Sequence, residues 1–193
     1  MGLLQQTFSW FRAIIGRMRR SFGVIGPACF LLALFSVSAF AQSRADQSRA
    51  VTTALRGGDF SRALELLQPV LQQFPGDAQL WTLQALAYSG KGQRAEALTS
   101  FHKALQLSPE YLPALEGAAQ LEYEMGGKEA PALLQRVVKL VPKDPTAHAM
   151  LGTLAYKNHN CSEAISHFQQ SAFLLDSQPE ALRGYGVCLA KTK

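Results

Sequence analysis

The chain has 193 residues, of which 48% are hydrophobic and 17% are charged, and its formal net charge at pH 7 is +5. This composition is typical of one ordinary globular domain. The first 41 residues hold four of the 19 basic residues and no acidic one, so the remainder has 15 basic and 14 acidic side chains. A net charge of +1 for that remainder gives no support for nucleic-acid binding, which requires a clustered basic face.

The N-terminal part of the chain has the pattern of a secretory signal peptide. A basic segment at 17–20 precedes an uncharged apolar run at 22–40, which ends in the small-x-small sequence Ala39–Ala41. We expect cleavage after this sequence, which makes 1–41 the leader, and a start at Met18 would give it ordinary proportions. An uncleaved anchor is the alternative, because about 20 apolar residues suffice to cross a bilayer. Both interpretations place the bulk of the chain outside the cytoplasm.

A three-point pattern recurs four times after the leader. An alanine is followed four residues later by leucine or phenylalanine, and eight residues after that by proline or aspartate. Successive copies are offset by 34, 33 and 34 residues. Such a period indicates a solenoid of stacked helical hairpins. The positions are Ala63, Leu67 and Pro75; Ala97, Phe101 and Pro109; Ala130, Leu134 and Pro142; and Ala164, Phe168 and Asp176.

The second copy also contains Trp81, Ala85 and Tyr88, and with them it resembles the tetratricopeptide repeat (TPR) family pattern W-x2-L-G-x2-Y, A-x3-F, P. The resemblance implies an all-α fold, namely an alpha-alpha superhelix (TPR solenoid) of about four helical hairpins plus a C-terminal helix. The first copy is degenerate in its first helix, as expected at the end of an array. The predicted units are 42–77, 78–110, 111–144 and 145–178, followed by a terminal helix or truncated fifth unit at 179–193.

The third unit is one residue shorter than its neighbours, which leaves two alignments of its first helix. Counting forward from Pro109 aligns Leu115 with Trp81, whereas counting back from Ala130 aligns Ala114 with it. We favour the forward alignment, because a glycine pair later in the unit can absorb the shortened loop.

Several polar residues stand immediately before apolar helical patterns and are predicted N-caps. These are Asp59, Asp77, Asp144 and Asn160. The last one begins the sequence Asn160-Cys161-Ser162, which is also a glycosylation sequon, but the capping role is the one we predict.

The sequence shows no convincing catalytic constellation. His148, His159, Cys161 and His167 crowd into the fourth unit, but they follow no known metal-ligand spacing. We therefore predict no metal, no cofactor and no enzymatic activity. Cys161 and Cys188 are the cysteines that remain after cleavage, and we expect them to pack as small apolar residues in preference to forming a disulfide.

The resemblance implies a groove along the first helices, where residues one, five and eight places after the tryptophan position point inward. The lysine, asparagine and arginine set with which Hsp90 and Hsp70 adaptors of this family clamp a terminal carboxylate is missing here. Two interpretations of Tyr123 and Tyr156 stay open: they hold an extended peptide or helix by stacking and hydroxyl hydrogen bonds, or they are scattered aromatics on an ordinary solvated face. The candidate groove residues are Thr82, Leu86 and Ser89; Glu116, Gln120 and Tyr123; and Ala149, Thr153 and Tyr156, with Lys157 at the rim.

These observations predict an exported, periplasmic or secreted scaffold that is not an enzyme and binds a protein or peptide partner. No nucleic-acid partner is expected, and the chain would contact a membrane only if its leader stays uncleaved. Two alternatives remain open. The repeats could form the arm of a truncated enzyme such as a glycosyltransferase, or the chain could assist the assembly of cell-envelope complexes.

Overall fold

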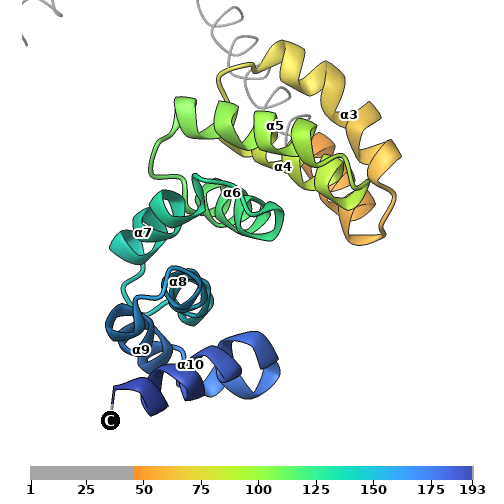
Figure 1. The fold of residues 1–193 in the computed structure, drawn as a ribbon. Coiled ribbons are helices and arrows are strands. Elements are labelled where there is room, and N and C mark those ends of the chain that lie inside the picture. The colour runs from red at the N-terminus through yellow and green to blue at the C-terminus, as the bar shows by residue number, and fades with distance from the viewer. Residues whose placement is uncertain (1–45, 193) are drawn as a thin grey trace, which may run out of the picture. The chain divides into compact units, whose positions relative to one another are not determined.

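The structure is a computed structural model that describes residues 46–192 (Figure 1). The predicted leader, its possible start at Met18 and its alternative role as an anchor lie outside these residues. Within them, every regular element is helical, which confirms the prediction of an all-α chain. No helix of this part combines the length and the hydropathy that crossing a membrane requires.

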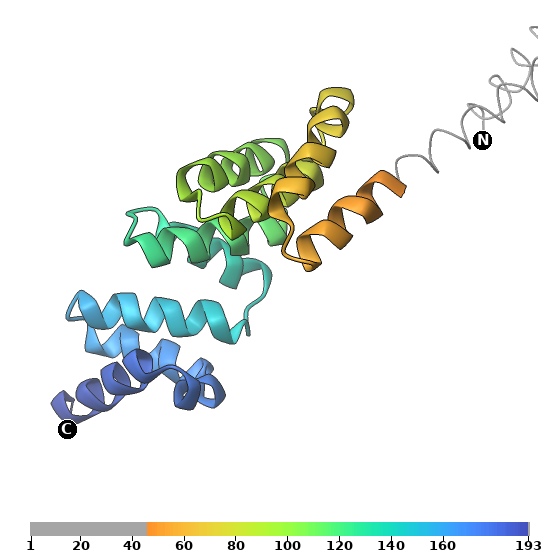
Figure 2. The ribbon, with the colours of Figure 1, turned by 90° about the vertical axis from the view of Figure 1, so that its right-hand side faces the viewer.

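The helices follow one another in antiparallel pairs, and each pair packs on the next in chain order (Figures 1 and 2). Residues 46–56 are helical and precede α3 (Phe60–Gln73). The next pairs are α4 (Ala78–Gly90) with α5 (Arg94–Leu107), α6 (Leu112–Met125) with α7 (Ala130–Leu140), and α8 (Pro145–Lys157) with α9 (Cys161–Gln170). A 3-10 segment, η1 (Ala172–Ser177), then leads into α10 (Pro179–Lys191).

Asparagine and aspartate side chains cap several of these helices. Asp59 Oδ1 accepts a hydrogen bond from the Arg62 amide at 3.0 Å, and the Asp77 and Asp144 side chains cap α4 and α8 in the same way. At α9, Asn160 Oδ1 accepts from the Glu163 amide, and its Nδ2 donates to Glu163 Oε2 at 2.7 Å. The predicted caps are thus confirmed, and each satisfies an amide that the helix itself cannot pair.

The carbonyl of the proline that closes a unit accepts a hydrogen bond from a later side chain. Trp81 Nε1 donates to the Pro75 carbonyl at 2.8 Å, and His148 Nε2 lies 3.0 Å from the Pro142 carbonyl. Trp81 and His148 are each the fourth residue of their helix, as Leu115 is in α6, which supports the forward alignment of the third unit. Position in the repeat therefore explains why a histidine is buried at the start of α8.

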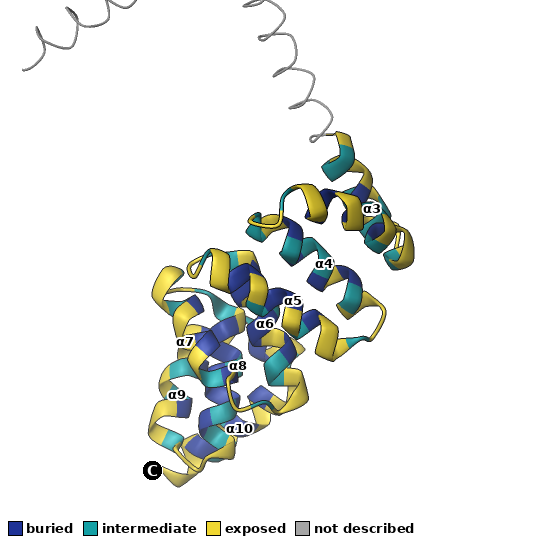
Figure 3. Ribbon diagram, turned by 90° about the horizontal axis from the view of Figure 1, so that it is seen from above, coloured by how far each residue is buried: buried dark blue, intermediate teal, exposed yellow. Residues whose placement is uncertain are grey.

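The core lies between neighbouring helices, where Figure 3 shows the buried residues, and exposed residues lie on the outer faces. Large and small residues meet across two of the boundaries between pairs. The ring of Phe101 lies against Gly117 and that of Phe168 against Gly184, so closely that a Cβ on Gly117 would lie 2.3 Å from Phe101 Cζ. At the boundary between α7 and α8 the corresponding residues are Leu134 and Met150.

We expect Gly152→Ala to lower the free energy of unfolding by about 1–3 kcal/mol, because the added methyl overpacks a buried site. The new Cβ would lie 2.7 Å from two ring carbons of Phe168, whose side chain is 0% exposed and has no room to move. Chemical denaturation followed by helical circular dichroism measures the change.

Gly186 provides the matched control, because it occupies the equivalent place in α10 and a methyl added there would meet no atom within 4 Å. Gly186→Ala should raise the free energy of unfolding by about 0.5–1 kcal/mol, since glycine is a poor helix former. Equal effects of the two changes would contradict the packing argument.

Candidate functional site

Three of the predicted groove positions are buried, and this corrects the expectation that they line an open surface. Thr82 is 3% exposed and Thr153 is 2% exposed, and Ala149 is buried with them. Each threonine Oγ1 donates to the carbonyl four residues earlier, at 2.9 Å, so its polar group is satisfied within its own helix. The short side chains are therefore covered by the neighbouring helices and offer nothing to a partner at the surface.

Three further predicted positions connect the first helices to one another. Lys157 Nζ lies 5.8 Å from the ring centroid of Tyr123 and 3.0 Å from Glu180 Oε1, which joins α6, α8 and α10. The ring of Tyr156 packs against Gly184 of α10. Both tyrosines are half-buried, and one face of Tyr123 is occupied by the lysine. Their contribution to partner binding stays a prediction.

The remaining predicted positions lie at the surface. Leu86 is 45% exposed and Ser89 is also exposed, both on α4. Glu116 and Gln120 are exposed on α6, where Gln120 Nε2 donates to Glu124 Oε1 at 3.0 Å. The structure thus brings only two of the predicted residues, Glu116 and Gln120, to the rim of one cavity.

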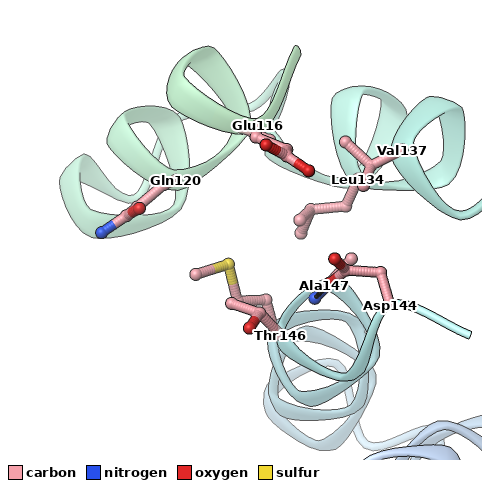
Figure 4. Close-up of a pocket in the computed structure, with 9 residues that line it drawn as sticks. Glu116, Gln120, Leu134, Val137, Asp144, Thr146 and Ala147 are labelled. Atoms are coloured by element: carbon pink, nitrogen blue, oxygen red, sulfur yellow. Dashed lines mark hydrogen bonds between the residues drawn. The ribbon is translucent and has the colours of Figure 1, made fainter. Parts of the chain in front are cut away.

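This cavity, which we call the unit 3–4 pocket, has a volume of about 280 Å³ and opens between α6, α7 and the start of α8. In Figure 4, Glu116 and Asp144 lie on opposite sides of the space that Leu134 enters from α7. The pocket is at the boundary where Leu134 and Met150 replace the phenylalanine–glycine pair of two other boundaries. Its lining residues are Glu116, Ala119 and Gln120; Leu134 and Val137; and Asp144, Thr146, Ala147 and Met150.

The pocket has both apolar and polar side chains in its lining, and two of the polar ones are carboxyl groups. Partial burial raises the pKa of Glu116 above its usual value, and the nearby charge of Asp144 raises it further. Asp144 Oδ1 accepts a hydrogen bond from the Ala147 amide, so one of its oxygens is used by the helix cap. Among residues 46–192, no lysine, arginine or histidine nitrogen lies within 4.0 Å of either carboxylate. The site is therefore acidic, and no basic side chain of residues 46–192 neutralises it.

Sequence reasoning found Glu116 and Gln120 but missed the other half of the pocket. Asp144 was predicted only as an N-cap, and Leu134 only as a repeat position. The sequence feature that could have indicated the pocket is a change in side-chain size at the boundary between the third and fourth units. Where Phe101 and Phe168 have glycines as partners sixteen residues later, Leu134 has Met150.

A second, more open cavity of about 620 Å³ lies between α3 and α4. Lys91 Nζ donates to Ser61 Oγ at 3.1 Å across its edge, and the exposed Glu65 of its lining is paired with Arg62. None of the predicted groove residues lines this cavity.

The histidines of the fourth unit form a hydrogen-bonded pair. His148 Nδ1 lies 2.9 Å from His167 Nδ1, and because a carbonyl only accepts, the bond to Pro142 assigns the proton of His148 to Nε2. His167 therefore donates from Nδ1. Burial lowers the pKa of His167 and proximity to His148 lowers it further, while Glu163 raises it. In the described part of the chain, no group of three or more His, Cys, Asp or Glu residues is placed to hold a metal.

Cys161 and Cys188 are joined by a disulfide, which corrects the expectation that they only pack as small apolar residues. Their Cα atoms lie 4.9 Å apart, a separation within the range that a disulfide can bridge. The bond connects the start of α9 to α10 across a sequence separation of 27 residues. The sequence alone could not reveal this, because the pairing depends on how α10 packs on the fourth pair.

A family model described as tetratricopeptide repeat matches residues 48–111. The mitochondrial import receptor subunit TOM70 of Rattus norvegicus is 24% identical over 142 residues, which make up 72% of this chain and 23% of that protein. The chain thus spans about a quarter of the length of the curated relatives it matches first.

Solved structures share the arrangement of helices. The crystal structure of MamA matches with a TM-score of 0.66 at 18% identity, covering 77% of this chain and 81% of MamA. The structure of YrrB, described as a TPR protein with an unusual peptide-binding site, matches with a TM-score of 0.65 at 22% identity and covers 74% of each chain. At these identities the likeness shows a common fold, the solenoid of stacked helical hairpins.

Proposed function

Because this chain belongs to the tetratricopeptide repeat family, we propose that it is an exported, non-enzymatic scaffold that holds a peptide segment of a protein partner at the unit 3–4 pocket. The observation that carries the proposal is the pocket itself, a cavity between α6, α7 and α8 at a boundary that lacks the phenylalanine–glycine contact found at two other boundaries. A protein that only stacked its units would gain stability by filling it.

A preformed pocket suits peptide recognition for a physical reason. The helices that line it are held by the core of the array, so binding a partner does not require them to be ordered first. Leu134 and Val137 are buried in that core, while Glu116 and Thr146 lie at the exposed edge of the pocket. The pocket can therefore hold an apolar part of a peptide and can select the peptide through polar groups at its edge.

The proposed location rests on two independent features. The leader pattern at 1–41 is that of a secretory signal peptide. The Cys161–Cys188 disulfide supports the same location, because disulfides persist in oxidising compartments outside the cytosol. We therefore assign the scaffold to the periplasm or the extracellular space.

Filling the pocket should block binding. We expect Thr146→Trp, at the exposed edge of the pocket, to weaken the affinity for a peptide selected from a random displayed library by about tenfold or more, the loss of a single good anchor. Isothermal titration calorimetry on the full chain measures the affinity, and circular dichroism checks that the helix content is unchanged.

The control is Thr99→Trp, which places the same side chain at an exposed position of α5 that does not line the pocket. It should bind the selected peptide as the wild type does. Unchanged affinity in the Thr146 variant would show that the peptide binds elsewhere and would overturn the assignment of the pocket.

A further inference from the structure

We propose that the unit 3–4 pocket receives the side chain of a lysine or arginine, so that the protein recognises basic peptide segments. This inference rests on the proposed function and adds the chemistry of the partner to it. It is carried by the placement of two carboxyl groups, from α6 and from the cap of α8, at the edges of one cavity whose lining also includes apolar side chains.

The shape and lining of the pocket fit a long side chain with a charged end. Its volume of about 280 Å³ is slightly below the range of roughly 300–1,000 Å³ that is typical of small-molecule sites, so it suits one side chain better than a cofactor. Half-buried Met150 provides an apolar wall for the methylene groups, and Leu134 and Val137, each only 2% exposed, lie at the base of the pocket. Lysine and arginine bury such stems while keeping the charged head at a polar edge.

The charges of the pocket select a cation. Glu116 and Asp144 are close enough for their charges to repel, and burial, followed by the charge of Asp144, raises the pKa of Glu116. A bound ammonium or guanidinium group would relieve this repulsion and would form charge-assisted hydrogen bonds. An acidic side chain in the same place would meet two like charges, so the site discriminates against it.

The N-terminus of α8 lies beside the pocket and carries partial positive charge, which would favour an anion. Here that charge is already compensated within the chain, because Asp144 Oδ1 accepts from the Ala147 amide at 2.6 Å. Glu116 has no such partner in its own helix among the hydrogen bonds of the described residues. The uncompensated charge of the pocket is therefore negative.

The test uses the full chain and a displayed library of random peptides. We expect the selected peptides to share one lysine or arginine at a fixed position. Replacing that residue by its uncharged analogue, norleucine for lysine or citrulline for arginine, should weaken the affinity roughly tenfold to a hundredfold. This is the loss of affinity that corresponds to removing a hydrogen bond to a charged group.

The matching protein variant is Glu116→Gln combined with Asp144→Asn, which removes both charges and keeps the sizes of the side chains. Asparagine is as good an N-cap as aspartate, so α8 should still begin at the same residue. This variant should bind the charged and the uncharged peptide with similar affinity. Glu65→Gln with Asp59→Asn is the control, since it makes the same changes at exposed positions of α3 and its cap.

The outcomes separate this inference from the proposed function. The inference would be overturned if the selected peptides lack a common basic residue or are acidic. It would also be overturned if they bind the double variant as they bind the wild type. In each case the proposed function of peptide binding would stand. Failure to select any peptide would overturn the proposed function and the inference with it. Charge-dependent binding that is lost in the pocket variant and kept in the control supports both.

Discussion

Replacing Phe101 with alanine is expected to lower the free energy of unfolding by about 3–5 kcal/mol, the usual range for removing a large aromatic side chain from a core. Phe101 is 1% exposed and belongs to the central cluster, which joins α4 to α8. Its ring fills the space left by Gly117 across the boundary between the second and third pairs. The truncation would therefore leave a cavity between two units, and each unit depends on its neighbours for burial.

Urea denaturation of the full chain, followed by helical circular dichroism, gives the change in stability. Phe173→Ala is the control, because the same side chain is removed from η1, where Phe173 is 74% exposed. That change should alter the free energy of unfolding by no more than about 0.5 kcal/mol. Similar losses from the two variants would contradict the assignment of Phe101 to the core between units.

Reduction of the Cys161–Cys188 bond should lower the free energy of unfolding by about 3–4 kcal/mol in the chain-entropy model, given the length of the loop that it closes. The bond holds α10 to the fourth pair at the C-terminal end of the described residues. Loss of the bond should therefore also accelerate amide exchange in α10 more than in α4 or α6.

The measurement compares the thermal midpoint and the amide exchange of the full chain with and without dithiothreitol. A variant with both Cys161→Ala and Cys188→Ala carries no bond to reduce, so the reagent should leave it unchanged. If the wild type and the variant respond equally, the reagent acts elsewhere. If neither the midpoint nor the exchange of α10 changes in the wild type, the bond does not stabilise the terminal helix.

Two kinds of boundary between units occur in this array: closely packed ones and one that contains the pocket. The Phe101–Gly117 and Phe168–Gly184 contacts close two boundaries tightly, and the boundary between them retains the pocket. If a peptide binds there, it contacts helices that are fixed from both sides, which reduces the ordering cost of association. The packing of the array and the proposed recognition are then two consequences of one pattern of side-chain sizes.

The sequence by itself determined the features that depend on local spacing. The 33- and 34-residue period and the caps at Asp59, Asp144 and Asn160 follow from which residues stand at fixed spacings along the chain. The positions that the family resemblance implies on α6, Glu116 and Gln120, lie at its surface.

Only the tertiary structure decided the features that depend on distances across helices. It buried Thr82 and Thr153, brought Asp144 and Glu116 to one pocket, and placed Cys161 within bonding distance of Cys188. The physical reason is that a repeat pattern specifies which face of a helix is inward, whereas the space at each boundary depends on the volumes of side chains from two units. Leucine and methionine at one boundary leave a cavity, whereas phenylalanine and glycine meet closely at two others.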